Sequence, residues 1–142
     1  MLVSEIMKPG VISVSPDESA AYTSRLLYRH NIGSVPVCTS DGTLKGIVTD
    51  RDIVLRVVAA DSDPHNTPVS DIMSHSVITV SPDDDVKRAS KLMSISQVRR
   101  LPVVNDGRVV GMVSLGDLSQ IANFDTEAGA ALSDISMNLR KR

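Results

Sequence analysis

The sequence predicts an α/β fold made of two similar halves, each with the element order β-α-β-β-α. Three observations predict it: an internal repeat, alternation of β-branched runs with helical spacing, and Asp-Gly turns at matching places. The offset between copies is 66 residues before the turn and 65 after it, a period typical of a duplicated supersecondary unit. The copies match as "VSEIM" (3–7) with "VSDIM" (69–73), "VISVSPDE" (11–18) with "VITVSPDD" (77–84), and "GIVTDRDI" (46–53) with "GMVSLGDL" (111–118).

Each copy is predicted to begin with a strand and a helix. The β-branched runs "VISV" (11–14) and "VITV" (77–80) favour extended backbone. Ser15 and Ser81 are predicted helix N-caps, each followed by proline at the first helical position and an acid at the third. The helical spacing predicts buried faces made of Ala20, Ala21, Ser24 and Leu27, and of Val86, Ala89, Ser90 and Met93.

Two further strands and a second helix complete each copy. "SVPVC" (34–38) and "LPVV" (101–104) are predicted to pair, through Asp-Gly turns, with "LKGIVT" (44–49) and "VVGMVS" (109–114). Helices are expected to follow at 50–60 and 115–122, and the polar stretch "DSDPHNTP" (61–68) links the copies. The expected organisation is repeat 1 at 1–62, repeat 2 at 63–123, and a helical tail at 124–142.

Composition argues against several classes of partner. The formal net charge is −2, and the chain has no Trp, two Tyr and one Phe, so neither a basic field nor aromatic stacking favours nucleic acid. No apolar run approaches the roughly 18 residues of a membrane span. The single cysteine, Cys38, cannot form an internal disulfide, which is typical of a reducing cytosol. We therefore expect a cytoplasmic protein without nucleic-acid or membrane partners.

The phrase Ser/Thr-x-x-Asp ends an apolar run in both copies. It occurs as Thr49-x-x-Asp52 and as Ser114-x-x-Asp117. Hydroxyl-x-x-acid is the pattern of a helix capping box, which needs no ligand. A carboxylate at a strand end can also accept hydrogen bonds from the hydroxyls of a ribose. The spacing alone leaves both interpretations open.

Taken in order, these motifs resemble a pair of cystathionine-β-synthase (CBS) domains, the arrangement called a Bateman module. The resemblance covers residues 3–122 and is greatest to small stand-alone bacterial proteins of this family. It implies two repeats packed by their sheets with pseudo-twofold symmetry. It also implies two clefts between them that bind adenosine-containing ligands such as AMP, ADP or ATP, and assembly as a homodimer.

Carried over residue by residue, the resemblance assigns three groups of binding residues. The ribose contacts would be Thr49, Asp52, Ser114 and Asp117. The adenine pockets would use Ile47, Ser76, Val77 and Val98 in the first cleft, and Gly10, Val11, Ile32, Gly33 and Met112 in the second. Arg100 stands where the family often places a phosphate contact, and Arg51 and Arg99 are further candidates. The alternative for Arg99 and Arg100 is a solvated pair or an ion pair with the acids at 83–85. Because the counterparts of Arg100 and Arg51 are uncharged, the two clefts are expected to be unequal.

The expected function is a non-enzymatic regulatory module that binds an adenine nucleotide and signals to a protein target of unknown identity. The alternative is a ligand-independent dimerisation scaffold in which Asp52 and Asp117 only cap helices. A nucleotide-processing enzyme would need a nucleophile, a general base or a metal cluster. The sequence offers no such pattern, so no catalytic residue, catalytic cofactor or metal ligand is expected.

Overall fold

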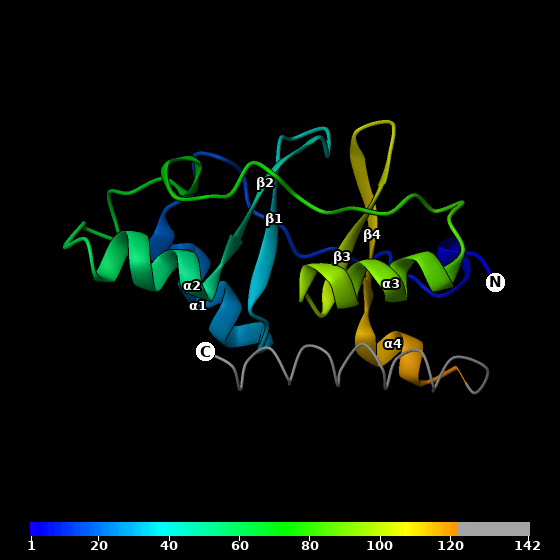
Figure 1. Ribbon diagram of the computed structural model, residues 1–142. Helices are drawn as coiled ribbons and strands as arrows, with labels where there is room; N and C mark the ends of the chain where they lie inside the picture. Colours follow the sequence, from blue (N-terminus) through cyan, green and yellow to red (C-terminus); the bar gives the residue numbers. More distant parts are fainter. Residues whose placement is uncertain (122–142) are drawn as a thin grey trace. The chain divides into compact units, whose positions relative to one another are not determined.

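The computed structural model describes residues 1–121 and confirms a mixed helix-and-strand fold (Figure 1). The predicted tail at 124–142 lies outside the described residues. The elements in chain order are η1 (Val3–Glu5), α1 (Ala20–His30), β1 (Ser34–Cys38), β2 (Leu44–Thr49), α2 (Asp50–Ile53), the π-helical η2 (Val54–Val58), η3 (Val69–Asp71), α3 (Val86–Ser96), β3 (Arg100–Asn105), β4 (Arg108–Ser114) and α4 (Leu115–Ser119).

The chain forms two compact units, each with its own antiparallel two-stranded sheet. The first-sheet unit is Ile12–Val77 and contains β1 and β2. Among the described residues, the second-sheet unit is Met1–Val11 together with 78–121 and contains β3 and β4. The strand pairings are equivalent, because Ser34 lies opposite Thr49 in one sheet and Arg100 lies opposite Ser114 in the other. The predicted pairing through Asp-Gly turns is therefore confirmed.

The segment that opens each sequence copy packs on the sheet of the other copy. Val3 of η1 donates its N–H to the carbonyl of Asp84 at 2.8 Å, inside the second-sheet unit. Val69 of η3 donates to the carbonyl of Glu18 at the same distance, inside the first-sheet unit. The two packing units therefore do not coincide with the two sequence repeats, because the leading segment of each repeat packs in the unit that contains the sheet of the other repeat. We call these leading segments, which contain η1 and η3, the exchanged segments.

The predicted first strands at 11–14 and 77–80 are wrong as full strands. Each run contributes one residue to a parallel bridge, Val14 with Val37 and Val80 with Val103. The pairing stops there, and Pro16 and Pro82 follow two residues later without an N–H for a ladder. Only the last residue of each β-branched run, Val14 or Val80, is therefore fully buried in a core.

The first long helix of each unit begins later than predicted. Ser19 caps α1 and Asp85 caps α3, four residues after the predicted caps Ser15 and Ser81. The Ser-Pro-Asp-acid motif closes a separate turn instead: Glu18 donates its N–H to the carbonyl of Ser15 at 3.1 Å. The predicted inner faces are confirmed except that Ser24 is half-buried, and Thr23 lies in the core beside them.

Each unit has its own apolar core, built from the inner faces of its helices and sheet. One core gathers Val14, Ala20, Leu27, Val35, Val37, Val48, Val57, Val69, Ile72 and Met73. The other gathers Val3, Val80, Val86, Ala89, Met93, Leu101, Val103, Val113, Leu115 and Leu118. Among the described residues, no helix has the length and apolar character required to cross a membrane.

Candidate ligand-binding sites

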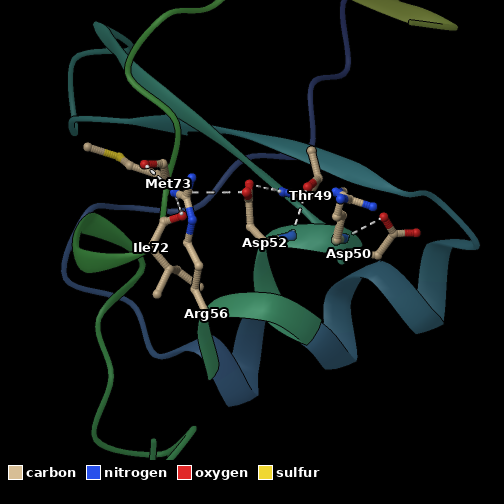
Figure 2. A network of polar contacts seen from close by, with 7 residues as sticks. Thr49, Asp50, Asp52, Arg56, Ile72 and Met73 are labelled. Carbon is tan, nitrogen blue, oxygen red and sulfur yellow. Dashed lines mark hydrogen bonds and ion pairs between the residues drawn. The ribbon is translucent and has the colours of Figure 1, made fainter. Parts of the chain in front are cut away.

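The repeated phrase builds a reciprocal cap at the start of α2. The N–H of Asp52 donates to Thr49 Oγ1 at 3.0 Å, and the N–H of Thr49 donates to Asp52 Oδ2 at 2.9 Å. This fills two donors that a helix N-terminus otherwise leaves unpaired. The prediction of a capping box is confirmed, and Figure 2 shows that Asp52 uses only one side of its carboxylate for it.

The second copy repeats the same geometry at the start of α4. The N–H of Asp117 donates to Ser114 Oγ at 3.0 Å, and the N–H of Ser114 donates to Asp117 Oδ2 at 2.9 Å. Both aspartates are buried, with 9% and 8% of their surface exposed. In each unit, a buried carboxylate therefore sits where a strand ends and a helix begins, held by one oxygen.

The second oxygen of each carboxylate faces a cation. Asp52 Oδ1 lies 3.9 Å from Arg56 Nη1, and Asp117 Oδ1 lies 3.4 Å from Lys8 Nζ. In the contacts of the described residues, Oδ1 makes these ion pairs and no hydrogen bond. We call Thr49, Asp52 and Arg56 the Asp52 site, and Ser114, Asp117 and Lys8 the Asp117 site.

The exchanged segments run directly beside the two sites. Ile47 in β2 and Ser74 exchange two backbone hydrogen bonds of 2.9 Å, and Met112 in β4 and Lys8 exchange bonds of 3.0 and 2.9 Å. These approaches require the glycine that opens each repeated phrase. A Cβ on Gly46 would lie 2.7 Å from the carbonyl oxygen of Ser74, and one on Gly111 would lie 2.7 Å from Met7 Sδ.

The predicted adenine-pocket residues divide between the two units. The first-sheet unit brings Ile47 to the segment that leads through Ser74 to Ser76 and Val77, and it also holds Ile32 and Gly33. The second-sheet unit brings Met112 to the segment that leads through Lys8 to Gly10 and Val11, and it also holds Val98. Ile32 and Val98 each pack against the core of their own unit. The adenine role of these residues stays a prediction.

The predicted phosphate-binding arginines are all exposed. Arg51 lies in the first turn of α2, beside the Asp52 cap. Arg100 opens β3 opposite Ser114, and the carbonyl of Arg99 accepts the N–H of Leu115 at 2.8 Å. Arg99 and Arg100 therefore both lie beside the Asp117 site. Their contact with a phosphate stays a prediction.

The sequence motifs do not identify Arg56 and Lys8 as residues of the two sites. Arg56 donates from Nη1 to the carbonyls of Ile72 and Met73 at 2.7 and 3.4 Å, so it ties the helix to the end of η3 (Figure 2). The i,i+4 spacing of Asp52 and Arg56 was the available signal. Lys8 carried no such signal, because it is distant in sequence from Asp117 and reaches it only through the exchanged segment.

Comparison with known protein families decides the relationship. The family model described as "CBS domain" matches this chain twice, over residues 3–59 and 69–122. The chain belongs to the CBS domain family. The predicted tandem CBS pair is thereby confirmed. The CBS domain-containing protein YhcV of Bacillus subtilis is 41% identical over 134 residues, covering 94% of each chain.

Two solved CBS structures similar to this chain contain ligands. Protein PAE2072 of Pyrobaculum aerophilum, complexed with AMP, has a TM-score of 0.76 and 28% identity, covering 91% of this chain and 98% of its own. The CBS domain pair of protein MJ0100, in complex with 5-methylthioadenosine and S-adenosyl-L-methionine, has a TM-score of 0.72 and 31% identity, covering 84% and 94%. The ligands named for both contain adenosine.

Proposed function

We propose that this CBS pair is a non-enzymatic regulatory module that binds an adenosine-containing ligand, and that Asp52 and Asp117 accept hydrogen bonds from its ribose hydroxyls. One observation carries the proposal. Each carboxylate completes its helix cap with Oδ2 and presents Oδ1 toward a cation, with which it forms an ion pair but no hydrogen bond among the described residues. Capping and ribose binding are then two simultaneous roles of one side chain.

The burial of these carboxylates is more than a cap requires. An N-terminal cap works on an exposed helix end, where water solvates the unused oxygen. Removing a charged carboxylate from water is costly unless hydrogen bonds and opposite charge compensate it. Asp52 and Asp117 are buried while one oxygen has only an ion pair of 3.9 or 3.4 Å. A ligand hydroxyl would supply the missing hydrogen bond.

The named ligands of the solved relatives support the ligand class. AMP carries a phosphate, whereas 5-methylthioadenosine and S-adenosyl-L-methionine do not, and adenosine is the part that all three share. Recognition by ribose and base is therefore the common feature. We propose that this chain binds AMP, ADP or ATP. In that complex Thr49 and Ser114 add hydroxyl contacts to the ribose. The predicted adenine-pocket residues contact the base, and the predicted arginines contact the phosphate.

Regulation would follow from differential affinity. A ligand shifts a conformational equilibrium only as far as it binds one state more tightly than the other. Ligand at either site would bear on the exchanged segment beside it, because Ile47 and Met112 hold those segments by paired backbone bonds. We propose that a homodimer in the cytoplasm passes this change to a protein target.

A ligand-independent scaffold is the second candidate function. It is favoured by the completeness of both caps and by three exposed apolar side chains of the helix α2–η2, Val54, Leu55 and Val58, which are 55%, 49% and 66% exposed. Such a surface suits contact with another chain. In that case the aspartates would serve stability alone, and no adenosine compound would bind.

Thermal unfolding with adenosine, AMP, ADP, ATP and S-adenosylmethionine separates the two functions. A ligand at one hundred times its dissociation constant stabilises the fold by about 2.7 kcal/mol. The double variant Asp52→Asn, Asp117→Asn keeps an oxygen for each cap and should lose this shift. The double variant Asp17→Asn, Asp83→Asn is the matched control, because these exposed acids occupy equivalent positions of the two copies and belong to neither site. The proposal fails if no compound raises the unfolding temperature, or if the Asp52→Asn, Asp117→Asn variant responds like wild type.

A further inference from the structure

The two sites hold their cations in different ways. Arg56 is fixed, because Nη1 donates to the carbonyls of Ile72 and Met73 at 2.7 and 3.4 Å while facing Asp52. The Lys8 side chain is 74% exposed, and among the described residues its ammonium contacts only Asp117. One cation is therefore tied to the backbone, whereas the other can leave its carboxylate by rotating about side-chain bonds.

The cations also come from opposite sides of the equivalent sites. Ile121 occupies the position in the second copy that corresponds to Arg56, and Ser74 occupies the position that corresponds to Lys8. Each site thus has one cation of this kind, supplied by the helix in one case and by the exchanged segment in the other. The duplication conserved the carboxylate geometry and varied the source of positive charge.

The charged residues that flank the two sites also differ. Arg99 and Arg100 lie beside the Asp117 site, where Arg100 faces Ser114 across the sheet. The corresponding residues beside the Asp52 site are the uncharged Gly33 and Ser34. Asp50 and Arg51 flank the Asp52 site with opposite charges that offset each other, and their counterparts at the Asp117 site, Leu115 and Gly116, are uncharged. The Asp117 site is consequently the more basic of the two.

From these contacts we propose that Lys8 makes the Asp117 site prefer adenosine ligands that carry phosphate over those that do not. The inference rests on the proposed function and deepens it. A ribose hydroxyl that donates to Asp117 Oδ1 takes the position that the Lys8 ammonium faces in the free protein. The displaced ammonium stays within a few ångströms of the bound nucleoside and contacts its phosphate. Arg56 makes no such movement, because two carbonyls hold it.

A consequence is that Lys8 acts in opposite directions on two ligands. It competes with adenosine, which offers no anion in exchange for the lost ion pair. It assists ATP, whose phosphates replace Asp117 as its partner. At separations of about 6–8 Å, one such charge changes affinity by about threefold when it is screened as in bulk water, and by tens of fold at the effective dielectric constant near a protein surface. The ratio of ATP affinity to adenosine affinity is therefore the quantity that reports on Lys8.

The test uses calorimetric titration of the full chain with adenosine and with ATP. Asp52→Asn is used to remove ligand binding at the Asp52 site. Lys8→Met is then compared with Lys8→Arg in that background. Met keeps the length and apolar stem of the lysine, and the backbone bonds of Lys8 to Met112 do not involve its side chain. Lys8→Met should lower the ratio of ATP to adenosine affinity at least threefold, whereas Lys8→Arg should retain it.

The outcomes separate this inference from the proposed function. If wild type binds nucleotides but Lys8→Met changes the ratio less than threefold, the role of Lys8 is wrong and the proposed function stands. An equal loss of affinity for adenosine and for ATP also contradicts the role of Lys8, because that result indicates that Lys8 acts on the structure of the site. If wild type binds neither adenosine nor ATP, both proposals fail together. Arg56→Met in an Asp117→Asn background is the matched control and should change the ratio less than Lys8→Met does.

Discussion

Replacing Gly46 by alanine tests the close approach of the exchanged segment to β2. A Cβ at this position would lie 2.7 Å from the carbonyl oxygen of Ser74 and from Met73 Sδ, and 3.0 Å from Met73 Cγ. Favourable contacts between such atoms begin near 3.4–3.5 Å, so the segment has to move by about 0.7 Å. The methionine can rotate, but the carbonyl of Ser74 cannot move alone, because it accepts the N–H of Ile47 at 2.9 Å.

The expected cost follows from this crowding. Overpacking a well-packed site typically costs about 1–3 kcal/mol. We expect the upper half of that range for Gly46→Ala, because a hydrogen-bonded backbone atom is in the way. Gly111→Ala should cost less, about 1 kcal/mol, since the nearest atom is the flexible Met7 Sδ at 2.7 Å and the carbonyl of Lys8 lies at 3.1 Å. For a chain of this size the Gly46 variant should melt roughly 5–12 °C lower.

Urea unfolding of both variants measures the difference, with Gly116→Ala as control. Gly116 lies in α4 with only Ser114 Oγ near, at 3.6 Å, so alanine there should stabilise by about 0.5–1 kcal/mol. Shortening Met7 in the Gly111→Ala background should relieve most of the cost, whereas shortening Met73 should relieve less of the Gly46 cost. A Gly46→Ala variant as stable as wild type, or a larger loss of stability for Gly111→Ala, would contradict the close backbone approach at Gly46.

Three further predictions concern the caps, the fixed arginine and the thiol. Asp117→Ala should lower the free energy of unfolding by about 1 kcal/mol and Asp117→Asn by less, because asparagine keeps an acceptor for the N–H of Ser114; equal losses in urea unfolding would contradict the cap. Arg56→Met should cost about 1–2 kcal/mol and speed amide hydrogen exchange at Ser74, because two carbonyls lose their donor; unchanged exchange would contradict the tie to η3. Burial raises the pKa of the Cys38 thiol, which a hydrogen bond with Ser13 partly offsets. The unfolded thiol then ionises first, so unfolding free energy should fall as pH rises above about 8.5 in wild type and stay level in Cys38→Ala.

Local patterns in the sequence determined much of this fold. The Asp-Gly turns and β-branched runs specified both hairpins, and Ser/Thr-x-x-Asp specified both caps, because these features depend on residues within a few positions of one another. The same local logic failed at Ser15 and Ser81. There the pattern of a helix start is satisfied by an isolated turn, and the helix begins only where the chain reaches Ala20 and Val86.

Tertiary structure decided what surrounds the caps. The sequence by itself determined the duplication, the family and the two carboxylates, because these are carried by residue identity and spacing. It did not reveal that the leading segments are exchanged, which places Lys8 beside Asp117 and the carbonyls of Ile72 and Met73 beside Arg56. Contacts between residues far apart in the chain depend on packing, and a spacing rule contains no information about them. The different cations of two sites that share one motif are therefore a property of the fold.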